Sequence, residues 1–211
     1  MIELVDNLIQ FCAVLLGCIW SGMLYLKNRH QPYFLLSCFY GCFALGLLYW
    51  ILYFILFGET PDLFYVSEII WIASFVLLYL LQFTLSPPLL RSFRCKVAYL
   101  APLIGAVLLV FYILRGDVFS GILRCAVMTA LAWDGIRAIA FYRGEKPASK
   151  QQARCRFHRA ILAFVVLENC LWISSSFWLG DTLANPYFWI DFALTGCLIS
   201  FLLVMRKTVR V

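Results

Sequence analysis

Charged residues are scarce in this chain of 211 residues. Only 13% of its residues are Asp, Glu, Lys or Arg, whereas 64% are hydrophobic and 18% are aromatic. A soluble domain carries roughly 25% charged residues, so this composition could not give a water-soluble fold a polar surface. No stretch between the apolar segments is long enough for a separate soluble domain. We therefore predict a single membrane domain over residues 1–211, with the lipid bilayer as its main solvent.

Histidine is almost absent, and its scarcity excludes one class of membrane enzyme. His30 and His158 are the only two histidines, and both flank apolar segments. A zinc hydrolase embedded in the membrane needs several histidine ligands, and no Gly-x-Ser-Gly type nucleophile is present either. We expect no metal and no other cofactor. An intramembrane enzyme that uses two buried carboxylates for acid–base work remains a third choice behind the two functions given below.

The nine cysteines do not form a disulfide framework. Seven of them fall inside apolar segments, and Cys95 and Cys155 fall in basic connections. No Cys-x-x-Cys pair is present, and disulfide-rich frameworks belong to small secreted domains. We expect the cysteines to be small apolar packing residues.

Seven apolar stretches approach the roughly 20 residues that a spanning helix requires. Short segments with turn residues or charges separate them. The first stretch could be mistaken for a secretory signal, but its leading residues Glu3 and Asp6 are acidic rather than basic, and we expect it to be retained as a helix. The predicted spans are about 7–26, 33–57, 63–85, 97–114, 118–142, 160–179 and 187–205.

Lysine and arginine gather in alternate connections. Of the seventeen in the chain, two lie in the first connection, three in the third, six in the fifth and three in the tail. Because cytoplasmic loops carry the excess of basic residues, we predict an N-terminus outside and a C-terminus in the cytoplasm. Acidic residues mirror this bias on the outer side, at Glu3, Asp6, Glu59, Asp62, Asp117 and Asp181.

This topology also explains the net charge of +6. The basic fifth connection is interpreted as an orientation signal that faces anionic lipid, and no nucleic-acid partner is expected. Short loops and the lack of disulfides favour the plasma membrane of a bacterium.

Two segments of the chain resemble each other. Residues 12–22 read CAVLLGCIWSG and residues 125–135 read CAVMTALAWDG, so that Cys, Ala, Val, Trp and Gly match at one offset. Further on, a Trp-Ile pair precedes Gly-acid-Thr by the same spacing in both copies, and an acidic residue opens the next span. These pairs are Trp50 with Trp172, Gly58 with Gly180, Glu59 with Asp181, Thr60 with Thr182, and Glu68 with Asp191. A chance likeness between apolar segments is the alternative to a duplication.

If the duplication is real, repeat 1 covers about 7–85, repeat 2 covers about 118–205, and the span at about 97–114 links them as parallel copies. This three-plus-one-plus-three plan resembles that of the SWEET/PQ-loop transporters, the KDEL receptors and the microbial rhodopsins. The Pro-Gln pair of the PQ-loop proteins is missing at both equivalent loops. In a rhodopsin-like alignment Thr195 takes the place of the retinal-binding lysine, and every lysine lies in a loop. The resemblance therefore implies a fold and no retinal.

Six charged residues fall within the predicted spans, where each costs about 2.5–3.5 kcal/mol on the insertion scale and usually faces a cavity or a partner. Asp134 and Arg137 are three residues apart on one helix, so we interpret them as a local structural pair. The other four are Glu68, Arg124, Glu168 and Asp191.

These four residues predict a polar, ligand-binding pocket that opens outward. Trp172 and Ser175 continue the helical face of Glu168, and Thr195 continues that of Asp191. The remaining expected neighbours are Phe75 and Gln82 on the face of Glu68, with Trp71 and Trp189 flanking the pocket. The alternative is that Arg124 only neutralises carboxylates within a packed bundle.

Two functions remain open. The first is a carrier for a small polar solute, with its site between the two repeats. The second is a receptor or sensor that signals through a cytoplasmic protein partner docked on the basic fifth connection and the tail. A carrier should have polar residues on both sides of the membrane along its axis, whereas a receptor should have a closed inner half.

Overall fold

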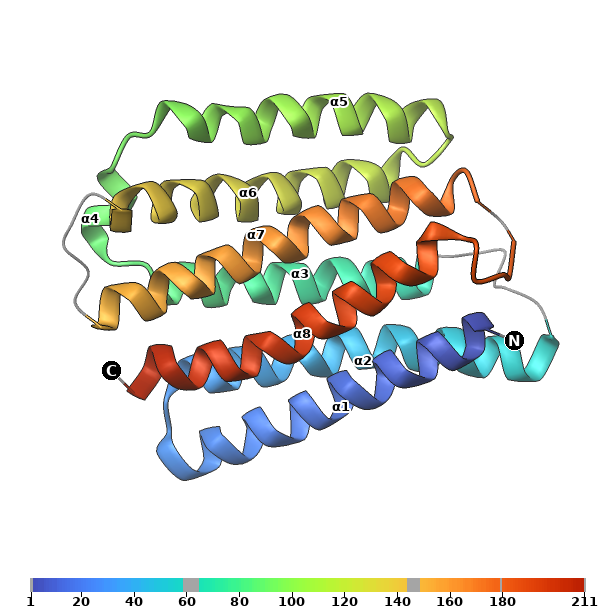
Figure 1. Cartoon of the computed structure of the whole chain (residues 1–211), viewed down its shortest axis with the longest axis horizontal. Coiled ribbons are helices and arrows are strands. Elements are labelled where there is room, and N and C mark those ends of the chain that lie inside the picture. The colour runs from blue at the N-terminus through green and yellow to red at the C-terminus, as the bar shows by residue number, and fades with distance from the viewer. Residues whose placement is uncertain (1, 59–64, 144–148, 179, 211) are drawn as a thin grey trace.

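The computed structural model describes residues 2–58, 65–143, 149–178 and 180–210, and the described residues form helices without a strand (Figure 1). Long helices run side by side, and a short helix and a 3₁₀ turn join the third long helix to the fourth. The elements are α1 Ile2–Asn28, α2 Gln31–Phe57, α3 Tyr65–Leu85, α4 Pro88–Ser92, η1 Lys96–Tyr99, α5 Leu100–Leu114, α6 Phe119–Arg143, α7 Ser149–Ser175 and α8 Pro186–Arg210.

Among the described residues, six segments are long and apolar enough to cross a membrane. They lie in α1, α2, α3, η1 with α5, α7 and α8. Six apolar helices of this kind are the hallmark of a multi-pass membrane protein. The helix α6 is not among the six, although it has 25 residues. Its sequence carries Arg124, Asp134 and Arg137, and these charges lower its hydropathy.

The largest departure from the predicted boundaries is in α7. This helix begins at Ser149 rather than near residue 160, and it ends at Ser175. The segment 149–159 is rich in Lys, Gln, Ala and Arg, which favour helices as strongly as apolar residues do, so the helix continues where hydropathy stops. Cys155, which was expected in a loop, is therefore buried in α7. The predicted boundaries at 63 and 179, and the acidic residues Glu59 and Asp62, lie outside the described residues.

Six of the long helices form a closed ring. Around the ring, each helix contacts the next in the order α1, α2, α3, α6, α7 and α8, and α8 contacts α1. The helix α5 lies outside this ring and packs on α6 and on η1 (Figure 1). The residues that project inward from the ring can therefore meet one another, whereas most residues of α5 are exposed on the outside of the bundle.

Arg137 connects α6 to the short helix α4. Its side chain donates hydrogen bonds to the carbonyl oxygens of Leu90 and Arg91, at 2.8 and 2.7 Å, and to that of Phe93 at 3.0 Å. It also pairs with Asp134 at 3.2 Å. The guanidinium thus satisfies carbonyls at the end of α4, which is a structural role.

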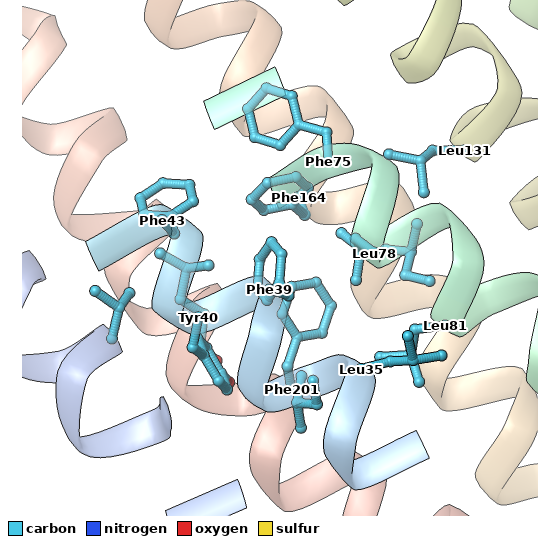
Figure 2. Close-up of a cluster of buried hydrophobic side chains, with 14 of the residues drawn as sticks. Leu35, Phe39, Tyr40, Phe43, Phe75, Leu78, Leu81, Leu131, Phe164 and Phe201 are labelled. Carbon is cyan, nitrogen blue, oxygen red and sulfur yellow. The ribbon is translucent and has the colours of Figure 1, made fainter. Parts of the chain in front are cut away.

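Aromatic rings fill the centre of the ring of helices (Figure 2). Phe39 of α2 meets Phe164 of α7 and Phe201 of α8 edge to face, with ring centroids 6.0 and 5.9 Å apart. Phe75 of α3 meets Phe164 in the same manner at 5.6 Å. All four side chains are at most 2% exposed. We call Phe39, Phe75, Phe164 and Phe201 the aromatic cluster; it joins α2, α3, α7 and α8 across the middle of the bundle.

The aromatic cluster should carry much of the stability of the bundle. Replacing Phe39 with Ala leaves a cavity where three helices meet, and we expect the free energy of unfolding to fall by about 3 kcal/mol. The measurement is unfolding in detergent micelles. Phe57→Ala is the matched control on the same helix, because Phe57 is 65% exposed. Equal losses in the two variants would contradict the central role of the aromatic cluster.

Candidate functional site

One end of the bundle encloses a pocket of about 610 Å³. At this end α1, α3, α6 and α8 begin and α2, α5 and α7 finish (right side of Figure 1). The volume lies within the range of roughly 300–1,000 Å³ that is typical of small-molecule sites. The exposed residues Arg115, Trp178 and Asp181 form part of its rim. The pocket therefore opens at this end of the molecule.

Most of the residues that the sequence singled out meet at this pocket. Its lining includes Glu68, Glu168, Trp172, Ser175 and Asp191, together with Trp71. Arg124 and Thr195 are not part of the lining. Each of them contacts residues that do line the pocket. The expectation for Trp189 was wrong: this side chain is 61% exposed and donates a hydrogen bond to the carbonyl of Leu183 at 2.9 Å.

Arg124 lies behind the pocket wall, where α6 packs on α3 and α7. Its Nη2 is 3.6 Å from Oε1 of Glu68. The guanidinium carbon is 3.2 Å from the ring centroid of Trp172 and 5.5 Å from that of Tyr112. The side chain of Arg124 is only 2% exposed. A buried cation that touches both a carboxylate and the face of an indole is held by charge and by the ring quadrupole together.

Three polar residues of α1 were missed by the reasoning from sequence. Asp6, Asn7 and Gln10 are buried, with 1%, 6% and 3% exposure. Gln10 donates a hydrogen bond to Oδ1 of Asp191 at 2.6 Å, and its Nε2 is 3.2 Å from Oγ1 of Thr195. Their spacing along an otherwise apolar helix was the available signal, because positions three and four apart share one face.

Asp6 and Asp191 form a close pair of carboxyl groups. Asp6 precedes Gln10 by one turn on the same face of α1, and Gln10 contacts Asp191, so the two buried carboxyl groups are neighbours. Neither carboxyl oxygen of Asp6 has a donor partner among the described residues. Two carboxyl groups can share a hydrogen bond only when one of them carries a proton. The pair is therefore a place where the protein can hold one proton.

Glu168 lies near both Asp191 and Arg124. Its side chain is 3% exposed, and it accepts a hydrogen bond from Trp172. The charges of Asp191 and Arg124 both act on it. In the part of the chain that the structure describes, this end of the bundle thus holds four buried carboxyl groups and one buried guanidinium. The carboxyl groups are those of Asp6, Glu68, Glu168 and Asp191, and of these Arg124 pairs with Glu68 and acts on Glu168.

The rim of the pocket is held by hydrogen bonds between distant parts of the chain. The carboxylate of Asp181 accepts from the backbone N–H groups of Ile2 and Glu3, at 3.3 and 3.1 Å. It thereby caps the start of α1 from the connection between α7 and α8. Asn185 donates to the carbonyl of Gly180 at 2.9 Å and accepts from the N–H of Tyr187 at 2.9 Å. These contacts give the rim a defined shape.

A second polar pair lies beyond the aromatic cluster. Gln82 and His158 are at most 1% exposed, and Nε2 of Gln82 is 3.2 Å from Nδ1 of His158. Gln82 follows Glu68 on α3 by fourteen residues, which is about 21 Å along a helix. His158 was expected at the edge of a span, but the early start of α7 brings it into the bundle. The polar groups thus occur on both sides of the aromatic cluster.

No family model, curated protein or solved structure matches this chain. Its function is therefore inferred from the geometry of its own residues.

The Gln10 contacts give a first test of the site. Replacing Gln10 with Leu removes the donor of Asp191 in a buried place, and we expect the free energy of unfolding to fall by about 2 kcal/mol. Ile9→Ala is the control on the adjacent, 47% exposed position, and it should cost much less. Unfolding in detergent micelles measures both. A Gln10→Leu protein as stable as the unaltered chain would mean that the Gln10–Asp191 contact does not form.

Proposed function

We propose that this chain is a carrier for a small polar solute and that the 610 Å³ pocket is its binding site. The observation that carries the proposal is the convergence of Glu68, Glu168 and Asp191 on one pocket, with Arg124 behind its wall. Charges buried in a membrane domain are costly and typically mark a solute or ion pathway. Trp172, Ser175 and Thr195 complete the proposed site.

The carrier has seven spans in this proposal, with α6 as the fifth. Its 25 residues would measure about 37 Å, which exceeds the roughly 30 Å of the hydrocarbon core. Its contacts with α3, α5 and α7 support a place in the bundle where neighbours compensate its charges. The basic connections then orient the N-terminus outward and the C-terminus toward the cytoplasm, in the plasma membrane of a bacterium. The pocket opens to the outside.

The two halves of the chain act as parallel repeats in this proposal, with α5 as the linker. A two-fold axis that exchanges the repeats would map α3 onto α8 and α6 onto α1. It would therefore map the contact between α3 and α6 onto the contact between α8 and α1, and both contacts are present. Trp50 and Trp172 both line the pocket, and so do Glu68 and Asp191. These matched positions support a site at the junction of the repeats, as in other transporters built from repeats.

A carrier must expose its site to each side in turn. The aromatic cluster lies between the pocket and the Gln82–His158 pair, and Phe43 and Leu194 belong both to the pocket lining and to the same core. We propose that the aromatic cluster is the closed inner gate of an outward-open state. Rocking of one repeat against the other would part it and connect the pocket to the cytoplasmic side.

A receptor is the second candidate, and the closed inner half favours it. The residues of the aromatic cluster are almost fully buried, and no solute path crosses them in this state. The basic start of α7 and the basic end of α8 would then dock a cytoplasmic protein. A receptor binds its solute without moving it, which separates the two candidates by experiment.

The role of Asp191 can be tested by transport. Protein reconstituted in lipid vesicles is screened for uptake of labelled amino acids, amines, carboxylates and sugars. We expect uptake of at least one class, and we expect Asp191→Asn to reduce it roughly tenfold or more, because the loss of a charged partner is worth about 1.5–3 kcal/mol. Asp134→Asn is the control, since Asp134 pairs with Arg137 outside this pocket.

The outcomes separate the candidates. Binding without uptake would show that the protein is a receptor rather than a carrier. Uptake that is equal in the Asp191→Asn protein and the unaltered chain would remove Asp191 from the site. A screen that finds neither uptake nor binding would overturn the proposed function.

A further inference from the structure

The ionisable groups of the pocket are strongly unbalanced. Among the described residues that line it, six are acidic and one, Arg115, is basic. Arg115 is placed over the rings of Phe111 and Phe177, at 5.6 and 4.8 Å from their centroids. The acidic residues are Glu3, Glu68, Asp117, Glu168, Asp181 and Asp191.

Three of these carboxylates already have partners that account for them. Glu68 pairs with Arg124. Asp117 accepts a hydrogen bond from Ser120 at the start of α6, and Asp181 caps the first turn of α1. Partners of this kind are the usual reason for an acid at a helix N-terminus.

Glu168 and Asp191 differ from these three because they are the most deeply buried acidic residues of the lining. They are 3% and 2% exposed, and their hydrogen bonds come from the neutral side chains of Trp172 and Gln10. A neutral donor satisfies an oxygen but does not cancel a buried charge. The only nearby cation among the described residues, Arg124, is already shared with Glu68. A positive charge from outside the chain, either a proton or a bound cation, therefore has to balance the carboxyl groups on the floor of the pocket.

The walls of the pocket are suited to a cation that carries carbon. Trp50, Trp71, Trp172 and Tyr112 contribute aromatic rings to the lining. Ring faces attract ammonium and quaternary ammonium groups, and aromatic cages for such ligands are a recurrent solution. Trp172 already stacks on one cation, the guanidinium of Arg124, at 3.2 Å. The indole N–H of Trp71 has no hydrogen-bond acceptor among the described residues.

A bare metal ion is a poorer match. In the described part of the chain, no group of three or more His, Cys, Asp or Glu side chains could hold one. Hard divalent cations require about six or more oxygen ligands, whereas the indole rings of Trp50, Trp71 and Trp172 in the lining supply none. An anion would be repelled by Glu168 and Asp191.

The proton held between Asp6 and Asp191 is the positive charge that a bound cation would replace. A positive charge beside Asp191 favours the ionised form of both carboxyl groups, so the shared proton leaves when the cation binds. The other titratable or charged groups that act on this pair are Glu3, Glu168, Tyr187 and, beyond Glu168, Arg124.

We infer that the pocket binds a small organic cation, an amine or a quaternary ammonium compound, in exchange for a proton held between Asp6 and Asp191. This inference rests on the proposed function as a solute site and names its substrate class. The cation lies between the indole rings and the carboxylates of Glu168 and Asp191. One positive charge enters and one leaves, so the buried charge of the pocket is unchanged.

The test is titration calorimetry of the full chain in lipid nanodiscs, with empty nanodiscs as the reference. The probes are tetramethylammonium, benzylammonium, benzyl alcohol and benzoate, of which the last three differ mainly in charge. We expect the two cations to bind, and we expect benzylammonium to bind roughly tenfold or more tightly than benzyl alcohol, with benzoate weaker still. Titrations in two buffers of different ionisation enthalpy count the protons released, and we expect about one for each cation.

Variants assign the two parts of the exchange. Glu168→Gln should weaken binding of benzylammonium roughly tenfold, and Asp191→Asn serves the same purpose if Glu168→Gln does not fold. Asp6→Asn should leave cation binding in place and abolish the proton release, because Asp191 then has no carboxyl partner. Asp134→Asn, outside the pocket, should behave as the unaltered chain.

Each contrary result has a distinct meaning. Equal binding of benzyl alcohol or benzoate would overturn the preference for cations but leave a solute pocket in place. Cation binding without proton release would overturn the exchange. Failure of all four probes would overturn the inference, whereas the proposed function fails only if the vesicle screen also finds neither uptake nor binding.

Discussion

The contact of Arg124 with Glu68 and Trp172 is the interaction on which the rest of this bundle depends. Lipid offers a charged side chain no partner, so a charge on a helix within the bundle must be met by another helix. Arg124 on α6 meets a carboxylate on α3 and an indole on α7, at 3.6 and 3.2 Å. It therefore sets how α6 packs, and it closes the ring at the junction of α3 with α6.

Among the described residues, the buried acids Asp6, Glu168 and Asp191 have no ion pair of their own. Gln10 and Trp172 satisfy oxygens of Asp191 and Glu168, but charge balance requires a proton or a bound cation. The aromatic cluster closes one side of this region and the hydrogen-bonded rim shapes the other. A packed aromatic centre, a rim tied by Asp181 and an acidic floor together make a pocket that is open at one end of the bundle and closed toward the other.

Hydropathy along the chain was sufficient to predict the long helices, because a spanning helix satisfies its backbone within one segment. It could not predict the start of α7 at Ser149, which depends on helix propensity rather than on lipid. Glu168 and Asp191 were found because charge is conspicuous in an apolar helix. Gln10 and His158 were not, because a single polar residue becomes informative only when the rotation of its helix against its neighbours is known. Tertiary packing, not local sequence, decides which polar groups meet.

A double-mutant cycle on Arg124 and Glu68 tests the central pairing most directly. The free energy of unfolding is measured in detergent micelles for Arg124→Leu, Glu68→Gln and the protein that carries both changes. If the two side chains are a buried pair, Arg124→Leu strands the carboxylate, and the second change relieves part of that loss. The expected coupling energy is at least roughly 1.5 kcal/mol. Losses that simply add would contradict the pairing and, with it, the placement of α6 in the ring.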